Sequence, residues 1–198
     1  MSKNKLINII LLGDPNAGKA TQAGFLIKKY KLFNLDMGAE LRKPISIKKY
    51  DYANRSGKGI LARAEVVRGI FRDFLLNKIP TNRGILFNGT PKKISEAKLV
   101  AGLLKKTNRS EPLFIYLFIP FVEIVRRAKL RVEKVNGKLT RRPDDSPEAM
   151  KNRMKYYRTD IARVVKFFNS QYKHKKISGL GSRQEVKKRI ADYLSKVL

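Results

Sequence analysis

The sequence predicts an α/β protein in which helices cover both faces of a central parallel sheet, and three observations support this fold class. Short apolar runs of strand length alternate along the chain with helical patterns, which is the order expected of a three-layer α/β fold. The run at 112–119 is continuously apolar, as is typical of a strand buried on both faces. A glycine-bounded loop joins the first strand to the first helix. The chain of 198 residues suits one domain with a well-buried core.

Each element can be placed along the chain from its pattern. Five segments have the length and apolar content of sheet strands: 6–12, 32–35, 84–91, 112–119 and 174–178. Helices are expected from the glycine-bounded loop to Tyr30, and over 94–106, 120–131, 146–172 and 184–198. Ser146 followed by Pro147 is a typical helix start, and Asn136-Gly137 between β-prone residues predicts a tight hairpin. The segment 37–76, whose helical pattern is broken at 56–59, predicts a small helical insertion between two strands.

The composition belongs to a soluble globular protein. Hydrophobic residues make up 42% of the chain and charged residues 31%. No cysteine is present, which excludes disulfides and thiolate zinc sites, and the single histidine leaves few soft metal ligands. No secretory signal pattern is present and the run 6–12 is too short to span a bilayer. A cytoplasmic protein with no membrane partner is therefore expected.

The balance of charge is strongly positive. The chain has 45 Lys and Arg residues against 16 Asp and Glu, a formal net charge of +29. Such an excess attracts nucleotides, nucleic acids and anionic membranes alike. The lysines are spread along the chain, often in pairs, and a dispersed pattern is usually a solvated surface. RNA binding therefore stands as a second hypothesis, less favoured because charge alone indicates only non-specific association.

The loop at 13–21 carries the clearest chemical signal. It reads Gly-Asp-Pro-Asn-Ala-Gly-Lys-Ala-Thr and meets the spacing G-x-x-x-x-G-K. Its glycines let the backbone curl so that successive N–H groups point at phosphate oxygens, while the following helix adds its positive dipole end and Lys19 adds a full charge. The usual hydroxyl after the lysine comes one residue late, because Ala20 precedes Thr21. The sequence therefore predicts a nucleotide-phosphate site at this loop.

With the order of elements, this loop resembles the adenylate kinase (nucleoside monophosphate kinase) family over essentially the whole chain. The family loop reads G-x-P-G-A-G-K-G-T-Q-A, and residues 13–23 share its unusual threonine position. Further motifs match elsewhere: T-G-D-x-L-R at 37–42, G-x-x-x-D-G-x-P-R at 84–92, R-x-x-x-R at Arg127 and Arg131, and R-x-D-D with a later arginine at Arg142, Asp144, Asp145 and Arg153.

The resemblance implies a P-loop NTPase fold with a central parallel five-stranded sheet. It implies a single kinase domain over 1–198, containing a monophosphate-binding insertion at 37–76 and a lid at 133–142. This lid is short, like that of the short-lid members, and without cysteine it cannot be the zinc-bearing kind. A monomer is the family's common form.

The resemblance also implies which residues act. Phosphoryl transfer needs in-line alignment, neutralisation of charge and exclusion of water. Residues implied for ATP are Gly13, Asn16, Ala17, Gly18, Lys19, Ala20, Thr21, Arg127 and Arg131, with Arg127 stacked on the base. Residues implied for the monophosphate are Met37, Gly38, Arg42, Gly89, Lys92, Glu96, Arg142 and Arg153. The implied catalytic set is Lys19, Lys92, Arg131, Arg142 and Arg153.

The implied cofactor is Mg²⁺ bound with ATP, and four substitutions depart from the family pattern. The family's magnesium-supporting aspartate is Asn88, so no side chain is expected to ligate the metal directly, and Asn88 lies near it only by analogy. An arginine on the acceptor phosphate has become Lys92, which keeps charge but loses bidentate geometry. The threonine and glutamine that read adenine are Met37 and Glu96. A carboxylate only accepts hydrogen bonds and pairs better with guanine's N1–H and N2–H₂.

Three hypotheses follow. The first is a kinase that transfers the γ-phosphoryl group of ATP reversibly to AMP, the family's commonest acceptor. The second is a kinase with altered base preference, motivated by Met37 and Glu96. The third is a catalytically weak relative that binds RNA or a ribonucleoprotein, motivated by Asn88, Lys92 and the net charge. We rank them in this order, and retention of Lys19 and the arginine set indicates that phosphate chemistry persists.

Overall fold

The computed structural model describes residues 6–43, 58–130 and 146–198, together with the backbone of two short strands at 133–135 and 138–140. Its centre is a five-stranded sheet in the order β2-β3-β1-β4-β7. All neighbouring strands in this sheet are parallel. The strands are β1 (Asn8–Gly13), β2 (Phe33–Asp36), β3 (Ile85–Asn88), β4 (Pro112–Phe118) and β7 (His174–Ser178).

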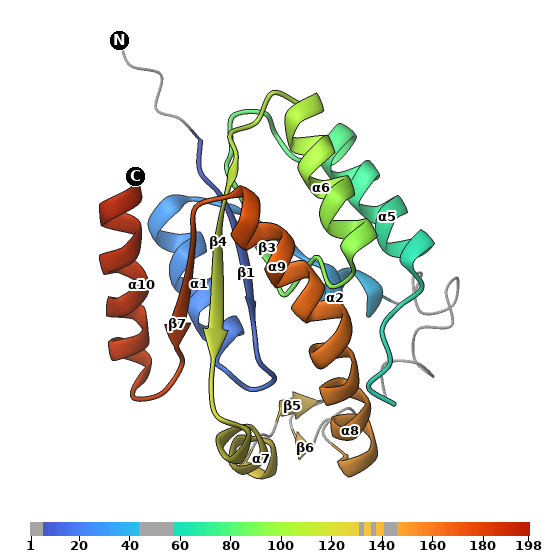
Figure 1. Ribbon diagram of the computed structural model, residues 1–198, viewed down its shortest axis with the longest axis vertical. Helices are drawn as coiled ribbons and strands as arrows, with labels where there is room; N and C mark the ends of the chain where they lie inside the picture. The colour runs from blue at the N-terminus through green and yellow to red at the C-terminus, as the bar shows by residue number, and fades with distance from the viewer. Residues whose placement is uncertain (1–5, 44–57, 131–132, 136–137, 141–145) are drawn as a thin grey trace.

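Helices cover both faces of the sheet, so the fold has three layers (Figure 1). On one side lie α1 (Lys19–Tyr30) and α10 (Arg183–Val197), and on the other α5 (Ala64–Asp73), α6 (Ile94–Lys106) and α9 (Ala162–Gln171). Each face has its own apolar cluster: Phe71, Phe87 and Phe114 on the α6 side, and Leu26, Leu86 on the α1 side, all at most 1% exposed. The predicted α/β class and central parallel sheet are confirmed.

The remaining elements gather near the carboxyl ends of the strands. They are α2 (Met37–Leu41), α7 (Phe121–Leu130), α8 (Pro147–Tyr156) and the antiparallel hairpin of β5 (Glu133–Val135) with β6 (Lys138–Thr140). Two π-helical turns, η1 (Phe74–Lys78) and η3 (Tyr157–Ile161), follow α5 and α8. Figure 1 shows α7, α8 and the hairpin together at one end of the sheet. This end therefore carries most of the loops that could form a site.

The elements match the sequence expectations closely, with two differences. All five predicted strands form, and four of them lie within two residues of their predicted bounds, while β3 is shorter than the predicted run 84–91. Ser146 caps α8 as expected, because its hydroxyl accepts a hydrogen bond from the Ala149 N–H. The helix predicted over 146–172 is instead divided into α8, η3 and α9. A π turn adds a residue per turn and so changes which side chains of the following segment face the sheet.

Several predicted features lie outside the described residues. They are the start of the break at 56–59, Arg131, the hairpin turn Asn136-Gly137, and the motif residues Arg142, Asp144 and Asp145. Within the part of the chain that the structure describes, no helix has both the length and the apolarity that crossing a membrane requires.

Candidate active site

The phosphate loop begins where β1 ends and turns directly into α1. Gly13 is needed at this point because a Cβ there would collide with the backbone carbonyl of Leu117 on β4. Gly18 caps α1 with φ of 89°, in the left-handed region where glycine is favoured. The loop therefore closes tightly against β4 and leaves the first N–H groups of α1 facing the end of the sheet.

Asn16 stands where the family loop has a glycine, and the structure shows how the loop accommodates it. Its φ is 60°, a left-handed conformation that asparagine tolerates better than most residues. The Asn16 side-chain amide donates to the backbone carbonyl of Ile124 at 3.2 Å, and the Asn16 backbone carbonyl accepts from Arg127 at 3.2 Å. The substitution thus keeps the glycine-like backbone and adds one side-chain contact to α7.

Two tyrosine hydroxyls hydrogen-bond to the first two residues of the phosphate loop, Gly13 and Asp14. The Tyr116 hydroxyl donates to the Asp14 carboxylate at 2.6 Å, and the Ile119 N–H donates to the same carboxylate at 2.9 Å. The Tyr157 hydroxyl, from the first residue of η3, donates to the Gly13 carbonyl at 2.9 Å. Burial raises the pKa of both phenols above the ordinary value, so both remain neutral donors.

The Gly13 carbonyl accepts hydrogen bonds from both Tyr157 and Lys19. The Lys19 Nζ donates to the Gly13 and Asp14 carbonyls, each at 2.7 Å. A lysine folded back onto its own loop keeps its charge within a few ångströms of the place where anion oxygens would lie. Because Tyr157 also satisfies Gly13, Lys19 can leave that carbonyl without orphaning it.

A pocket of about 400 Å³ opens over the phosphate loop and is lined by cations from five separate segments. Lys19 comes from α1, Arg127 from α7 and Arg153 from α8. Arg42 follows α2, and Lys92 follows β3. The other lining residues are Pro15, Asn16, Ala17, Gly18, Ala20, Thr21, Asp36, Gly38, Asn88, Gly89, Tyr156 and Tyr157. The described part of this pocket has five cationic side chains against the single carboxylate of Asp36, so it suits polyanions.

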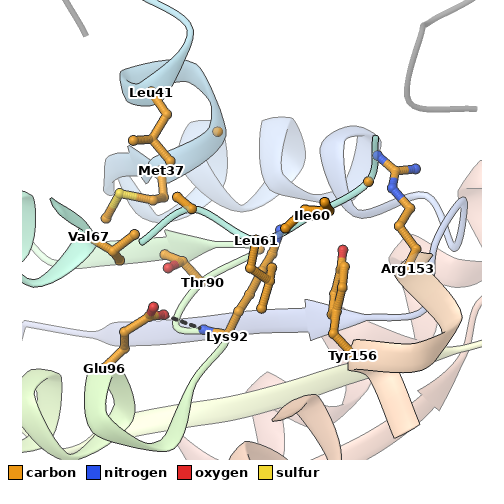
Figure 2. A pocket seen from close by; sticks show the side chains of 14 residues that line it. Met37, Leu41, Ile60, Leu61, Val67, Thr90, Lys92, Glu96, Arg153 and Tyr156 are labelled. Carbon is orange, nitrogen blue, oxygen red and sulfur yellow. Dashed lines mark hydrogen bonds between the residues drawn. The ribbon is translucent and has the colours of Figure 1, made fainter. Parts of the chain in front are cut away.

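A second, narrow pocket of about 70 Å³ adjoins the first and shares Gly38, Gly89, Lys92, Arg153 and Tyr156 with it. Its remaining walls are mostly apolar: Met37, Leu41, Gly59, Ile60, Leu61, Ala62, Val67, Thr90 and Glu96. Figure 2 shows Met37 and Val67 on the Glu96 side of Lys92, with Arg153 and Tyr156 on the other side. The two pockets form one cleft with a cationic part and an apolar part.

Glu96 is the one carboxylate of the second pocket's described lining. It is only 3% exposed. Its Oε2 accepts hydrogen bonds from the Lys92 and Lys93 N–H groups at 2.8 and 3.2 Å, and so caps α6 (Figure 2 marks the Lys92 bond). Burial raises the pKa of Glu96, and this outweighs the two N–H donors and the charges of Lys93 and Lys92, which lower it.

Arg127 is held rigidly at the edge of the first pocket. Its guanidinium donates to Glu123 at 2.6 Å, to the Asn16 carbonyl at 3.2 Å and to the Gly179 carbonyl at 3.0 Å. The hydrogen bonds from Arg126 and Arg127 lower the pKa of Glu123 to about 2, so this carboxylate stays ionised at neutral pH. Three elements are thereby fixed around one planar cation: α7, the phosphate loop and the segment after β7.

The structure brings together the described residues that the sequence singles out. Arg42 and all of the predicted ATP residues except Gly13 and Arg131 line the first pocket, and Gly13 opens the loop beneath it. Met37, Gly38, Gly89, Lys92, Glu96 and Arg153 line the second. Arg131 and Arg142 lie outside the described residues. Sequence reasoning missed Asp36, Tyr156 and Tyr157, although the helix that carries Arg153 continues directly into both tyrosines.

A parallel sheet with a glycine-bounded phosphate loop after its first strand, and a cationic cleft at the carboxyl ends, defines a P-loop phosphotransferase. The profile of the adenylate kinase family matches residues 11–173. The chain is 31% identical over 196 residues to an adenylate kinase of Azobacteroides pseudotrichonymphae, covering 94% of this chain and 96% of the relative. It is 32% identical over 186 residues to one from Leptospira biflexa, covering 90% and 94%.

A third relative, an adenylate kinase of Parabacteroides distasonis, is 28% identical over 198 residues and covers 97% of this chain and all of its own length. The chain belongs to the adenylate kinase family. This confirms the family predicted from the motifs, the P-loop α/β fold, and the enzyme class, a nucleoside monophosphate kinase. Adenylate kinases use ATP.

Proposed function

We propose that this chain transfers the γ-phosphoryl group of ATP reversibly to AMP, giving two molecules of ADP. One observation carries the proposal: five cations from separate segments line one pocket over a phosphate loop, and that pocket continues into an apolar one. Phosphoryl transfer requires mainly positioning and charge neutralisation, which such a cleft supplies.

The phosphate loop is assigned to ATP. Its N–H groups and the N-terminus of α1 would receive the β- and γ-phosphate oxygens, and Lys19 would turn from the Gly13 and Asp14 carbonyls onto them. Arg127, fixed beside Asn16 and Gly179, presents its plane at the edge of the same pocket, where a base could stack on it. The contacts support a donor site that is formed before nucleotide arrives.

The apolar pocket and its rim are assigned to AMP. Arg42 and Lys92 would hold its phosphate, and Arg153 lies at the junction of both pockets, where the transferring group would pass. Met37, Gly38, Gly89 and Glu96 would surround the nucleoside. The helical segment 37–76 would accordingly act as the monophosphate-binding part of a single kinase domain.

The lid is assigned by resemblance alone. Residues 133–142 would exclude water from the reaction, and Arg131 and Arg142 would join Arg153 around the phosphoryl group. Exclusion of water matters because hydrolysis of ATP competes with transfer to a second nucleotide.

Mg²⁺ is proposed as the metal that accompanies ATP, and the described residues fit a loosely held ion. Asn88 and Asp36 line the phosphate pocket, and their side chains offer oxygen ligands, which Mg²⁺ prefers. No group of three or more His, Cys, Asp or Glu among the described residues could hold a metal by itself. Asn88 and Asp36 would therefore hold the ion only loosely beside the ATP phosphates, where it would supply charge neutralisation.

A coupled assay for ADP with ATP, Mg²⁺ and each of AMP, GMP, CMP and UMP tests the proposal. ADP formation with AMP at a rate above the ATP-only control is expected, and it should fall about 1000-fold in Lys19→Met. No phosphoryl transfer to any of the four monophosphates would overturn the proposal. We propose that the enzyme acts as a monomer in the cytoplasm, and RNA binding stays a prediction of the net charge alone.

A further inference from the structure

The two carboxylate oxygens of Glu96 differ, because only Oε2 accepts backbone hydrogen bonds at the start of α6. Oε2 accepts the Lys92 and Lys93 N–H groups and so occupies both of its in-plane acceptor directions. Whatever Glu96 offers to a ligand in the apolar pocket must therefore come from Oε1. This restricts the carboxyl to a single contact atom, whose character depends on one proton.

The burial of Glu96 shifts its carboxyl towards the neutral form. Apolar walls from Met37 and Val67 remove water from the group, and burial raises the pKa of Glu96. Among the described residues, the charged groups that act on it are Lys92 and Lys93 at the start of α6, while Arg153 and Tyr156 from α8 line the same pocket on the far side of Lys92. A phosphate dianion held by Arg42 and Lys92 would offset the Lys92 charge, which lowers the Glu96 pKa, so AMP itself would raise that pKa further.

We propose that Glu96 recognises the adenine of AMP as a neutral carboxyl, with its proton on Oε1 donated to the ring nitrogen N1 of the base. This inference rests on the proposed function, because it takes AMP as the acceptor. Adenine presents an acceptor at N1 and a donor only at the neighbouring N6 amino group, so an ionised Oε1 placed at N1 would set two lone pairs against each other. AMP binding is thus coupled to retention or uptake of one proton at Glu96.

The same argument gives the opposite result for guanine. Guanine presents N1–H and N2–H₂ on the corresponding edge, and an ionised Oε1 can accept from them. Above the pKa of Glu96, AMP binding should weaken about tenfold for each pH unit while GMP binding does not. The preference for AMP over GMP therefore falls as the pH rises, so this chain would carry a proton-dependent choice of base.

The side chains that narrow the pocket belong to a segment outside the sheet and the helices. Ile60 and Leu61 narrow it, and both lie on the stretch between Lys58 and α5, outside any helix or strand. Figure 2 shows Leu61 beside Lys92 in the middle of the pocket. Displacing these two side chains widens the cavity towards the Glu96 carboxyl.

Isothermal titration of AMP into the whole protein tests the proposal without relying on turnover. Titrations in buffers of different ionisation enthalpy, from acidic to alkaline pH, count the protons taken up on binding. Glu96→Gln is the key variant, because its amide can still cap α6 and always carries a donor. Glu185→Gln is the matched control, since Glu185 caps α10 in the same way, by accepting the Ser182 N–H, and lies outside both pockets.

Proton uptake linked to AMP binding, with affinity that falls as pH rises, is expected in the wild type and in Glu185→Gln. Glu96→Gln should lose the uptake and keep its AMP affinity at alkaline pH, and the titration of the AMP phosphate itself cancels in the comparison. Equal proton counts in the wild type and Glu96→Gln would overturn the proposal, as would GMP binding more tightly than AMP at every pH. Proton-linked AMP binding without any phosphoryl transfer would uphold it and refute the proposed reaction instead.

Discussion

The two parts of the cleft are built in different ways. The donor part depends on backbone: a loop closed against β4 and α7, the N-terminus of α1 and a single lysine. The acceptor part depends on side chains, with Met37, Lys92 and Glu96 each projecting from a different element. Backbone N–H groups survive most substitutions, whereas a side-chain contact changes with the residue that makes it.

This difference explains why departures from the family pattern have different consequences in the two parts of the cleft. At Asn16 the loop keeps its left-handed backbone, so the departure from glycine leaves the phosphate cradle in place. At Lys92 and Glu96 the departures change a bidentate donor and a base-reading group. Changes in substrate choice are therefore expected at the acceptor part, and changes in overall rate at the donor part.

The largest effect is expected at the donor part. Lys19→Met removes the mobile charge of the phosphate loop and should lower kcat/KM about 1000-fold, because a preorganised group for the developing charge is lost. Lys28→Met on the exposed face of α1 removes the same charge from the same helix and should leave the rate unchanged. Steady-state kinetics of ADP formation checks both, and equal losses would mean that the loop is not the donor site.

Restoring family residues at each part compares the two directly. Lys92→Arg should lower the KM for AMP about tenfold, because a planar fork can bind two phosphate oxygens at once. Asn16→Gly should change the KM for ATP by less than about twofold, since glycine gains backbone freedom while the contact to Ile124 is lost. A larger effect from Asn16→Gly than from Lys92→Arg would contradict the contrast between the two parts.

The tyrosine behind the loop should matter for ATP but not for AMP. Tyr157→Phe removes the hydroxyl that donates to Gly13 and should raise the KM for ATP several-fold and lower the free energy of unfolding by about 1 kcal/mol. Tyr193→Phe is the control, because the buried Tyr193 hydroxyl has no hydrogen-bond partner in the described structure. Kinetics and urea unfolding measure both variants, and a rise in the KM for AMP alone would refute the anchoring role.

The metal dependence tests a departure that lies between the two parts. Asn88→Asp restores a carboxylate beside the phosphates and should lower the Mg²⁺ concentration for half-maximal rate about two- to threefold, because Mg²⁺ prefers charged oxygen ligands. Magnesium titrations at fixed ATP provide the measurement. An unchanged magnesium dependence would place the ion away from residue 88.

The smallest effect is a change in stability with pH. Burial raises the folded-state pKa of Glu96 above its ordinary value of 4.5, so the wild type loses stability as the pH rises from that value through the folded-state pKa. Glu96→Gln avoids this loss and should become the more stable protein at the alkaline end. Glu185 has a lowered pKa, because Ser182 donates to it, so Glu185→Gln should lose stability at neutral pH and match the wild type in acid. Urea midpoints across pH would reveal opposite signs for the two variants.

Much of the fold and part of the site could be predicted from local pattern. The strands could be predicted because buried parallel strands are continuously apolar. The phosphate loop could be predicted because its spacing of glycines and lysine occurs with one backbone geometry. The π turn at η3 could not be predicted, since no residue preference indicates where such a turn forms. The roles of Tyr116 and Tyr157 also depend on contacts 102 and 144 residues away along the chain. The resemblance placed Glu96 at the monophosphate site, but it did not show that the same carboxylate also accepts the Lys92 and Lys93 N–H groups at the start of α6.

The central claim is that this cleft holds two nucleotides end to end and passes a phosphoryl group between them. Following the γ-phosphorus of labelled ATP through a single turnover with excess AMP tests it most directly. The label should appear as the β-phosphorus of newly formed ADP. Label released as inorganic phosphate, with AMP unconsumed, would show transfer to water and contradict the account.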